Sequence, residues 1–332
     1  MARKKKRQKR KVRSGRQRTK AKKPRPGGRV LDITSADAVV AYKKTTKKVL
    51  EFQWAFYSEL AGQRKQVQDR LLAALTTAAV GPIERSGWQR AVRYKYSLHP
   101  LSAVGSLVSP VGGRFNIGDL DPVNFPPFPA LYVAADRETA EQELLCQGNP
   151  EAGLTNHDFA LTQASSISVV SVDMSLERCI DLRTTPSLHG FVDVVKTFEL
   201  SSHLKKRARA VKFPEPALVT LPSQLRKSLL DPDWRASPAR YDIPANSQLF
   251  GQLVYEAGIE GILYPSKMTK KEAIAIFPRN FANGESWIKI RDDLPHPDMV
   301  ACIDATSYPL AEKKADELGI TRASLPAAAT NH

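Results

Sequence analysis

The chain has 332 residues and a formal net charge of +16, a length that suffices to bury a core and to form one large domain with extensions. The excess charge belongs to residues 1–29, which hold sixteen Lys and Arg and no acidic residue, so the rest carries 34 basic and 34 acidic side chains. No apolar run reaches the roughly 20 residues of a membrane span, and no signal-peptide core follows the charged start. We therefore expect a cytoplasmic protein without a membrane segment.

Neither a structural metal site nor a disulfide framework is indicated. Cys146, Cys179 and Cys302 lie far apart without a CxxC pair, and the six His residues form no cluster. Zinc sites need closely spaced ligands, and disulfide scaffolds need paired Cys residues. We expect no metal, and reduced thiols that suit a reducing compartment.

Residues 1–30 are predicted to be a disordered basic arm, because they cannot bury enough apolar surface to offset the entropy of ordering. Such an arm attracts polyanions by neutralising phosphates, but this one lacks the aromatic residues that stack on bases. Non-specific nucleic-acid binding and a merely solvated tail both remain open.

Residues 31–84 are predicted to be a helical segment. Apolar residues recur at helical spacing after Ser35, which suits a helix cap, and Gly62 interrupts the pattern. We expect two helices, at about 36–61 and 64–80, that pack on the body of the protein or on a partner. The apolar positions of the first are Val39, Tyr42, Val49, Phe52, Phe56 and Leu60.

After Gly81-Pro82 the pattern changes to mixed strands and helices, which predicts an α+β fold with a mixed sheet. In the first strand, Ala91–Ser97, alternation places Tyr94 and Tyr96 on one face and Arg93 on the other. The proline-rich segment Asp121–Pro129 is predicted to be a loop. Further strands are expected at 130–135, 166–174, 262–264 and 273–277, and helices at 138–145 and 248–257.

Two short stretches offer chemistry, although each has a simpler explanation. The paired glycines of Gly112–Asn116 allow a sharp turn, after which Arg114 presents a planar fork suited to phosphate; a hairpin turn with an exposed arginine explains the same residues. In the helix at 138–145, Glu138, Glu141 and Glu143 cannot all share one face, because residues two apart do not meet, whereas Glu138 and Glu141 can. Solvated glutamates are the ordinary outcome.

Taken in order, these stretches resemble the RES domain family, which is named for an arginine, a glutamate and a serine. The matching positions here are Arg93, Glu143 and Ser266. The resemblance spans roughly residues 85–290, so we expect a RES-like catalytic domain at 85–295 and a C-terminal extension at 296–332. The ordered motifs are Arg93, Gly113–Asn116, Leu131–Tyr132, Glu143, Tyr264–Ser266 and Phe277–Asn280.

The resemblance implies a fold similar to ADP-ribosyltransferase toxins and NAD as the substrate, cleaved at its nicotinamide–ribose bond. Known relatives deplete NAD by hydrolysis or phosphorolysis, or transfer ADP-ribose to a protein, and a DNA-binding antitoxin usually covers their site. The acceptor here, whether water, phosphate or protein, stays open.

The departing nicotinamide leaves positive charge on the ribose, and a nearby carboxylate stabilises that charge; Glu143 is the candidate. Ser266 would donate and accept hydrogen bonds at the ribose or carboxamide. A nucleophilic role for Ser266 is disfavoured, because YPSKM lacks the G-x-S-x-G elbow.

The other candidates would bind the substrate. Arg93 and Arg114 would hold the diphosphate, and Tyr132 and Tyr94 would contact the nicotinamide side. Asn116 and Asn280 are secondary candidates, and Arg90 would replace Arg93 if the strand register differed by three residues.

A second hypothesis belongs to another class of protein. The long connection at Asp121–Pro129 and the long segment between Glu143 and Ser266 depart from the compact family pattern. With the basic arm, they allow a nucleic-acid-associated scaffold whose RES-like body is catalytically inactive.

Overall fold

The computed structural model describes residues 36–145, 167–211, 217–282, 284–294, 296–309 and 311–312. The predicted basic arm, Ser35 and Cys146 lie outside these ranges. The chain divides into two compact units, residues 1–46 and 47–332. Of the first unit, the described part is the beginning of helix α1.

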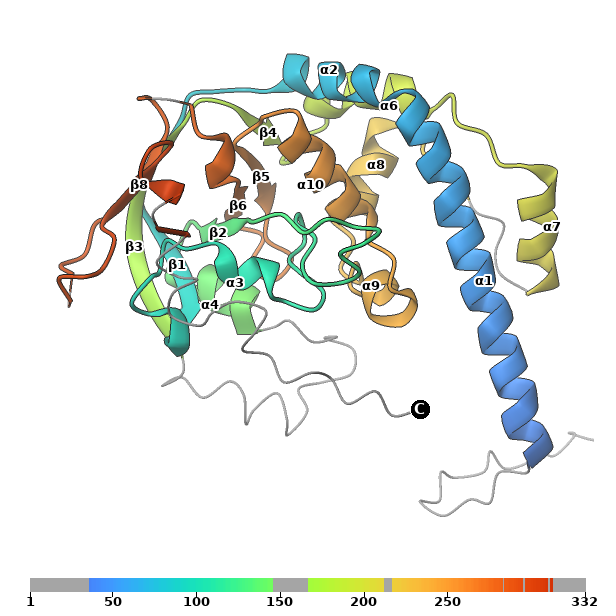
Figure 1. Ribbon diagram of the computed structural model, residues 1–332. Coiled ribbons are helices and arrows are strands. Elements are labelled where there is room, and N and C mark those ends of the chain that lie inside the picture. Colours follow the sequence, from blue (N-terminus) through green and yellow to red (C-terminus); the bar gives the residue numbers. More distant parts are fainter. Residues whose placement is uncertain are drawn as a thin grey trace, which may run out of the picture. The chain divides into compact units, whose positions relative to one another are not determined.

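An eight-stranded mixed sheet forms the centre of the second unit, with strand order β4-β5-β6-β2-β1-β3-β7-β8 (Figure 1). The pair β4–β5 is parallel, and the other neighbouring pairs are antiparallel. The predicted α+β fold class is confirmed. The strands are β1 (Ile83–Arg93), β2 (Leu131–Ala134), β3 (Ile167–Leu176), β4 (Cys179–Asp181), β5 (Gly261–Pro265), β6 (Glu272–Ile276), β7 (Trp287–Ile290) and β8 (Cys302–Asp304).

Helices follow most of the expected segments and add several between β4 and α10, where no element was predicted. Single turns of 3₁₀ helix in the described ranges are η1 (Tyr94–Tyr96), η4 (Pro186–Leu188) and η5 (Pro278–Asn280). The α-helices are α1 (Ala36–Gln66), α2 (Gln68–Ala78), α3 (Val104–Leu107), α4 (Arg137–Leu145), α6 (His189–Val195), α7 (Ser202–Ala210), α8 (Pro222–Leu229), α9 (Ala236–Tyr241) and α10 (Asn246–Glu256).

The central strands bury both faces of the sheet, each in its own apolar core. Side chains alternate between faces along a strand, so in β5 Ile262 and Tyr264 join one core while Leu263 joins the other. Helices α2, α6, α8 and α10 cover the first face (Figure 1). The second face is covered partly by residues 299–311.

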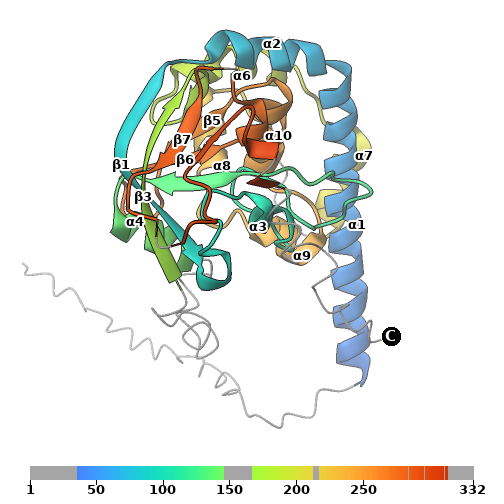
Figure 2. The same cartoon turned by 60° about the vertical axis from the view of Figure 1, so that its left-hand side comes forward.

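The boundary between the first two helices differs from the prediction. Gly62 does not end α1, because glycine is tolerated inside a helix whose neighbours propagate it; the break falls at Val67, whose backbone leaves the helical region. After Thr46, α1 lies beside α7, where Phe52 packs on Leu204 and Ala208, as Figure 2 shows for the two helices.

The predicted strand Ala91–Ser97 is wrong in its second half. Strand β1 runs from Ile83 to Arg93, and residues 94–96 turn into η1. The side-chain alternation expected for Tyr94 and Tyr96 therefore ends at Arg93. The proline-rich segment Asp121–Pro129 contains turns but no regular element, as predicted.

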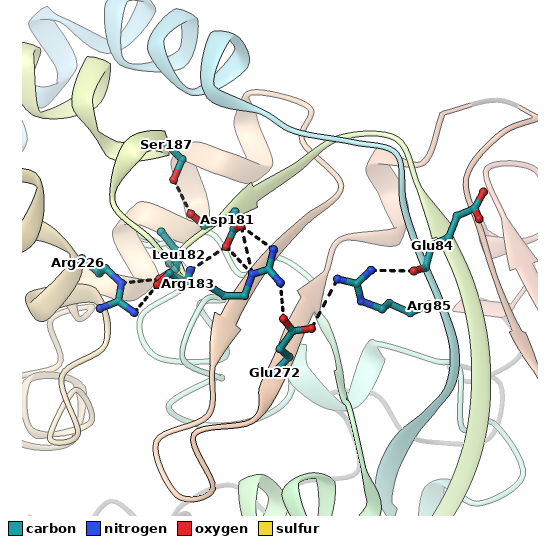
Figure 3. Close-up of polar contacts among 8 residues, drawn as sticks. All are labelled: Glu84, Arg85, Asp181, Leu182, Arg183, Ser187, Arg226 and Glu272. Carbon is teal, nitrogen blue, oxygen red and sulfur yellow. Dashed lines mark hydrogen bonds and ion pairs between the residues drawn. The ribbon is translucent and has the colours of Figure 1, made fainter.

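An ion network joins strands β1, β4 and β6 at one end of the sheet (Figure 3). Arg183 pairs with Asp181 (2.8 Å) and with Glu272, whose other oxygen lies 3.6 Å from Arg85. Arg226 of α8 donates to the carbonyl oxygens of Leu182 and Arg183, at 2.6 and 2.9 Å. Because these charges are partly exposed, the network contributes little stability, but it fixes α8, which leads into the site described below.

The described cysteines have no reactive character. Cys179 is buried and Cys302 is half-buried, and burial raises the pKa of both thiols. Among the described residues no group of three His, Cys, Asp or Glu is arranged to hold a metal ion. No helix in that part of the chain is both long and apolar enough to cross a bilayer.

Candidate functional site

Glu143 and Ser266 meet although 123 positions separate them. The Ser266 hydroxyl donates to Glu143 Oε1 at 2.6 Å, and the serine is fully buried. Glu143 comes from α4, and Ser266 follows β5 directly. A hydrogen bond to a charged acceptor is stronger than a neutral one, so this contact fixes the orientation of the carboxylate.

The first turn of α4 is attached to the turn that carries Ser266. Asp136 caps the helix by accepting from the Thr139 amide at 2.9 Å, and it pairs with Lys271 Nζ at 2.8 Å. The hydroxyls of Thr139 and Thr269 lie 2.8 Å apart. Lys271, followed by the Thr139 amide, lowers the pKa of the Asp136 carboxyl. These contacts fix the position of the helix that carries Glu143 relative to the turn that carries Ser266.

The loop Gly112–Asn116 lies against Tyr132 of β2. The Tyr132 hydroxyl donates to Asn116 Oδ1 (2.9 Å) and accepts from the Phe115 amide (3.0 Å). A Cβ at Gly113 would lie 2.3 Å from that hydroxyl, so the position requires glycine. Burial raises the pKa of Tyr132 well above its ordinary value, and the phenol therefore remains a donor.

Helix α10 fixes the same loop from the other side. Gln248 Nε2 donates to the carbonyl oxygens of Val111, Gly113 and Asn116, at 2.6, 3.1 and 3.0 Å. Gln248 is fully buried. The backbone that precedes and follows Arg114 is thus held rigidly.

Arg114 is buried and partly committed to the chain itself. Its NH1 donates to the carbonyl oxygen of Asp231 at 2.9 Å, and its guanidinium lies 5.9 Å from the ring centre of Trp234. The segment between α8 and α9 is therefore attached to the Gly112–Asn116 loop. This attachment brings residues 231–235 to the site.

A cavity of about 390 Å³ lies among these elements, a size typical of small-molecule sites. Arg93, Arg114, Tyr132 and Glu143 all line it. Ser266 lines a neighbouring cavity of about 480 Å³, and Pro232 and Lys267 line both.

The charge of the main cavity is strongly positive. Among the described residues, five basic ones and a single carboxylate line it, so an anionic ligand is favoured. The charged lining residues are Arg90, Arg93, Arg114, Arg235, Lys267 and Glu143.

Arg90 does not exchange roles with Arg93. Its buried guanidinium donates to the carbonyl oxygens of Pro100, Ser102 (2.9 Å) and Tyr132 (3.0 Å), and burial lowers its pKa to about 10. All three nitrogens are used in holding the backbone. Arg93 has no such partner among the described residues and keeps its expected place at the cavity.

Tyr94 is not placed where the strand alternation put it. Its side chain is 67% exposed and does not line the cavity, because the chain turns into η1 after Arg93. Tyr96 lines the cavity instead, and its ring lies 3.2 Å from the position of a Cβ added at Gly105.

The two secondary candidates, Asn116 and Asn280, use their side-chain amides to hold the backbone. Asn116 is fully buried and donates to the carbonyl oxygens of Ser106 and Phe128, both at 3.2 Å. Asn280 donates to those of Tyr255 (2.8 Å) and Ile259 (2.9 Å). Neither asparagine lines the cavity.

The sequence interpretation missed Tyr96, Trp234 and Arg235. The last two belong to the stretch Asp231–Arg235, a proline-containing turn between two short helices. An aromatic residue followed by arginine was the available signal, but only the contact of this turn with Arg114 places it at the cavity.

Comparison with known proteins gives one family. A model described as the RES domain matches residues 88–297, a range that contains Arg93, Arg114, Glu143 and Ser266. No curated protein matches the sequence. A chain from the crystal structure of the M. tuberculosis MbcT-MbcA toxin-antitoxin complex is similar in structure, with 12% identity and a TM-score of 0.39, over 74% of this chain and 97% of that one.

Proposed function

Since this chain belongs to the RES domain family, we propose that it cleaves NAD at the nicotinamide–ribose bond in the cavity beside Glu143. The predicted family membership is confirmed, and the family's activity on NAD is carried over to this chain as the proposal. The proposal covers hydrolysis, phosphorolysis and ADP-ribosyl transfer, which share the same bond cleavage.

One observation carries the proposal: the one carboxylate among the described residues of the cavity wall is fixed by a buried serine and is surrounded by basic residues. Ser266 donates to Glu143 Oε1 at 2.6 Å, and the other carboxylate oxygen accepts no hydrogen bond from the described residues. That oxygen is free to act on a ligand. The positive lining suits the diphosphate of NAD.

In the proposed reaction, Glu143 acts on the ribose as the bond to nicotinamide lengthens. Positive charge develops at the anomeric carbon, and a carboxylate whose orientation is already fixed stabilises it without reorganisation. Ser266 positions that carboxylate. Arg93 contributes a guanidinium that holds the substrate in line for attack. Tyr132, whose hydroxyl is bonded to Asn116 and to the Phe115 amide, offers its ring at the nicotinamide side.

We further propose that the protein is a toxin controlled by an antitoxin, as known RES-family members are. In such a pair the antitoxin would cover the mouth of the cavity. Water, phosphate and a protein side chain remain the candidate acceptors of ADP-ribose.

Release of nicotinamide tests the proposal. The full chain is incubated with NAD, and nicotinamide is quantified by chromatography beside an active RES protein. Glu143→Gln should lower turnover at least 100-fold while ADP-ribose binding persists. Glu141→Gln is the matched control, because Glu141 lies on the same helix and pairs with Arg137 (2.6 Å). No nicotinamide from the full chain would contradict the proposal.

The acceptor is identified by the mass of the products formed with and without phosphate. Free ADP-ribose indicates hydrolysis, ADP-ribose 1-phosphate indicates phosphorolysis, and a mass gain on a protein indicates transfer. Each product selects a different acceptor after the same cleavage.

A further inference from the structure

Arg235 occupies an unusual position at the edge of the main cavity. It follows Trp234 and precedes α9, and its guanidinium lies 4.4 Å from the centre of the Trp234 ring. The side chain lines the cavity. Among the described residues, no hydrogen bond or ion pair joins this guanidinium to another group.

A second guanidinium lies near the same ring. Arg114 is 5.9 Å from the ring centre of Trp234, and both arginines line the cavity. Burial, and then the charge of Arg114, lower the pKa of Arg235 to about 10. The Glu143 carboxylate in the same cavity acts in the opposite direction and raises the pKa of Arg235. One carboxylate facing two guanidinium groups still leaves an excess of positive charge, which a bound anion would neutralise.

We propose that Trp234 and Arg235 form an anion-binding subsite that takes the diphosphate of a nucleotide. The identity of the nucleotide rests on the function proposed above, whereas the subsite itself rests on the unpartnered guanidinium and its neighbours. A planar fork of N–H donors matches the oxygens of a diphosphate, and the buried ring of Trp234 keeps the fork in place.

The two arginines have different tasks. Arg114, whose NH1 is used by the Asp231 carbonyl oxygen at 2.9 Å, attaches the segment 231–235 to the Gly112–Asn116 loop. It is a positioning residue. Arg235, whose guanidinium has no hydrogen-bond partner in the described part of the chain, contacts the anion directly.

A structural role for Arg235 gives a different expectation. The contact with Trp234 is a cation–π interaction, and such an interaction stabilises the turn without any ligand. In that case replacing Arg235 would change the stability of the protein but not its affinity for a diphosphate.

The test measures binding of ADP and of adenosine to the full chain by titration calorimetry at 150 mM salt. Arg235→Gln should weaken ADP binding at least tenfold and leave adenosine binding unchanged. Arg235→Lys should fall between the two, because it keeps the charge and loses the fork. Arg240→Gln, on the exposed side of α9, is the control and should bind ADP normally. Thermal unfolding checks that each variant is folded.

Equal ADP binding by the wild type and Arg235→Gln would overturn the subsite, as would a wild type that does not bind ADP. A protein that binds ADP through Arg235 but releases no nicotinamide from NAD keeps the subsite and loses the proposed function. A protein that cleaves NAD at the same KM with and without Arg235 keeps the function and loses the subsite.

Discussion

Ser266 and Glu143 show how a single hydroxyl can control a carboxylate. Because Ser266 is buried and donates at 2.6 Å, Ser266→Ala removes a hydrogen bond to a charged group, an interaction of about 1.5–3 kcal/mol. We expect kcat for NAD to fall about 10- to 100-fold, with little change in KM, since the bond orients the group that acts in the transition state.

Steady-state kinetics at several NAD concentrations separate the two parameters. Ser266→Thr keeps the hydroxyl and is the conservative control, which should recover part of the rate. A Ser266→Ala variant with normal kcat would show that the orientation of Glu143 does not depend on this serine.

Individual cavity residues could be predicted where they belong to the ordered motifs of the RES family. They could not be predicted where only the three-dimensional fold brings them to the cavity. Arg93, Arg114, Tyr132 and Glu143 share one cavity although the last lies 50 positions from the first. Arg235 carries no comparable signal in the sequence. Its place depends on a hydrogen bond between Arg114 and the backbone of residue 231, a contact that no local pattern encodes.

The stability of helix α4 depends on its N-terminal cap, Asp136, and we expect this contribution to change with pH. Asp136 caps the helix, and such a cap contributes about 1 kcal/mol, so Asp136→Ala should lower the free energy of unfolding by about that amount at pH 7. Lys271 and the Thr139 amide lower the folded-state pKa of Asp136 from 3.8. The stabilisation is therefore present above pH 3.8 and is lost as the pH falls through the lower, folded value.

Urea unfolding at pH 7 and at pH 3 measures this profile. Asp136→Asn is the control, because asparagine also caps helices and loses only the charge. A difference between the wild type and Asp136→Ala that persists undiminished at low pH would contradict the assignment of the cap to the ionised carboxylate.

The packing of α10 on the Gly112–Asn116 loop leaves no space for a side chain at Gly251. A Cβ there would lie 2.1 Å from the carbonyl oxygen of Phe115, so Gly251→Ala must displace the helix from the loop. We expect a loss of about 1–3 kcal/mol in the free energy of unfolding, as for overpacking elsewhere.

Gly62→Ala is the matched control for this change. Gly62 lies inside α1 with no atom within 4 Å of the added Cβ, so alanine should stabilise the helix by up to about 1 kcal/mol. Chemical denaturation of both variants measures the change in the free energy of unfolding, which should be a loss for Gly251→Ala and a gain for Gly62→Ala. A neutral Gly251→Ala would mean that the helix and the loop are not in close contact.

The elements themselves were predictable to the extent that their periodicity was local. β2, β5, β6, α4 and α10 fall within about two residues of their expected bounds. The end of β1 was not predictable, because residues 91–97 continue to alternate beyond Arg93. At Arg93 the backbone instead turns into η1 (Tyr94–Tyr96), a change of direction that the alternation of side chains does not encode.

At the scale of the whole molecule, the charge is divided between two parts of the chain. Residues 1–29 carry all of the net charge of +16, and the remainder is formally neutral. Within that neutral remainder, the positive lining of the cavity is therefore a local arrangement and not a consequence of overall composition. The ligand of the cavity and the ligand of the arm must therefore be identified separately.

Deleting residues 1–29 should separate the two activities. We expect the deletion to leave NAD turnover within about twofold of the full chain, because the described residues that line the cavity all lie beyond position 89. Retention on DNA or RNA should be lost, and in the full chain it should weaken steeply as salt rises, since it depends on released counter-ions. Filter binding at 50 and 200 mM salt and nicotinamide release measure the two effects. If neither the full chain nor the deletion variant cleaves NAD, and only the full chain retains nucleic acid, the scaffold hypothesis replaces the enzyme hypothesis. Nucleic-acid binding through the arm would then be the activity that the experiment detects.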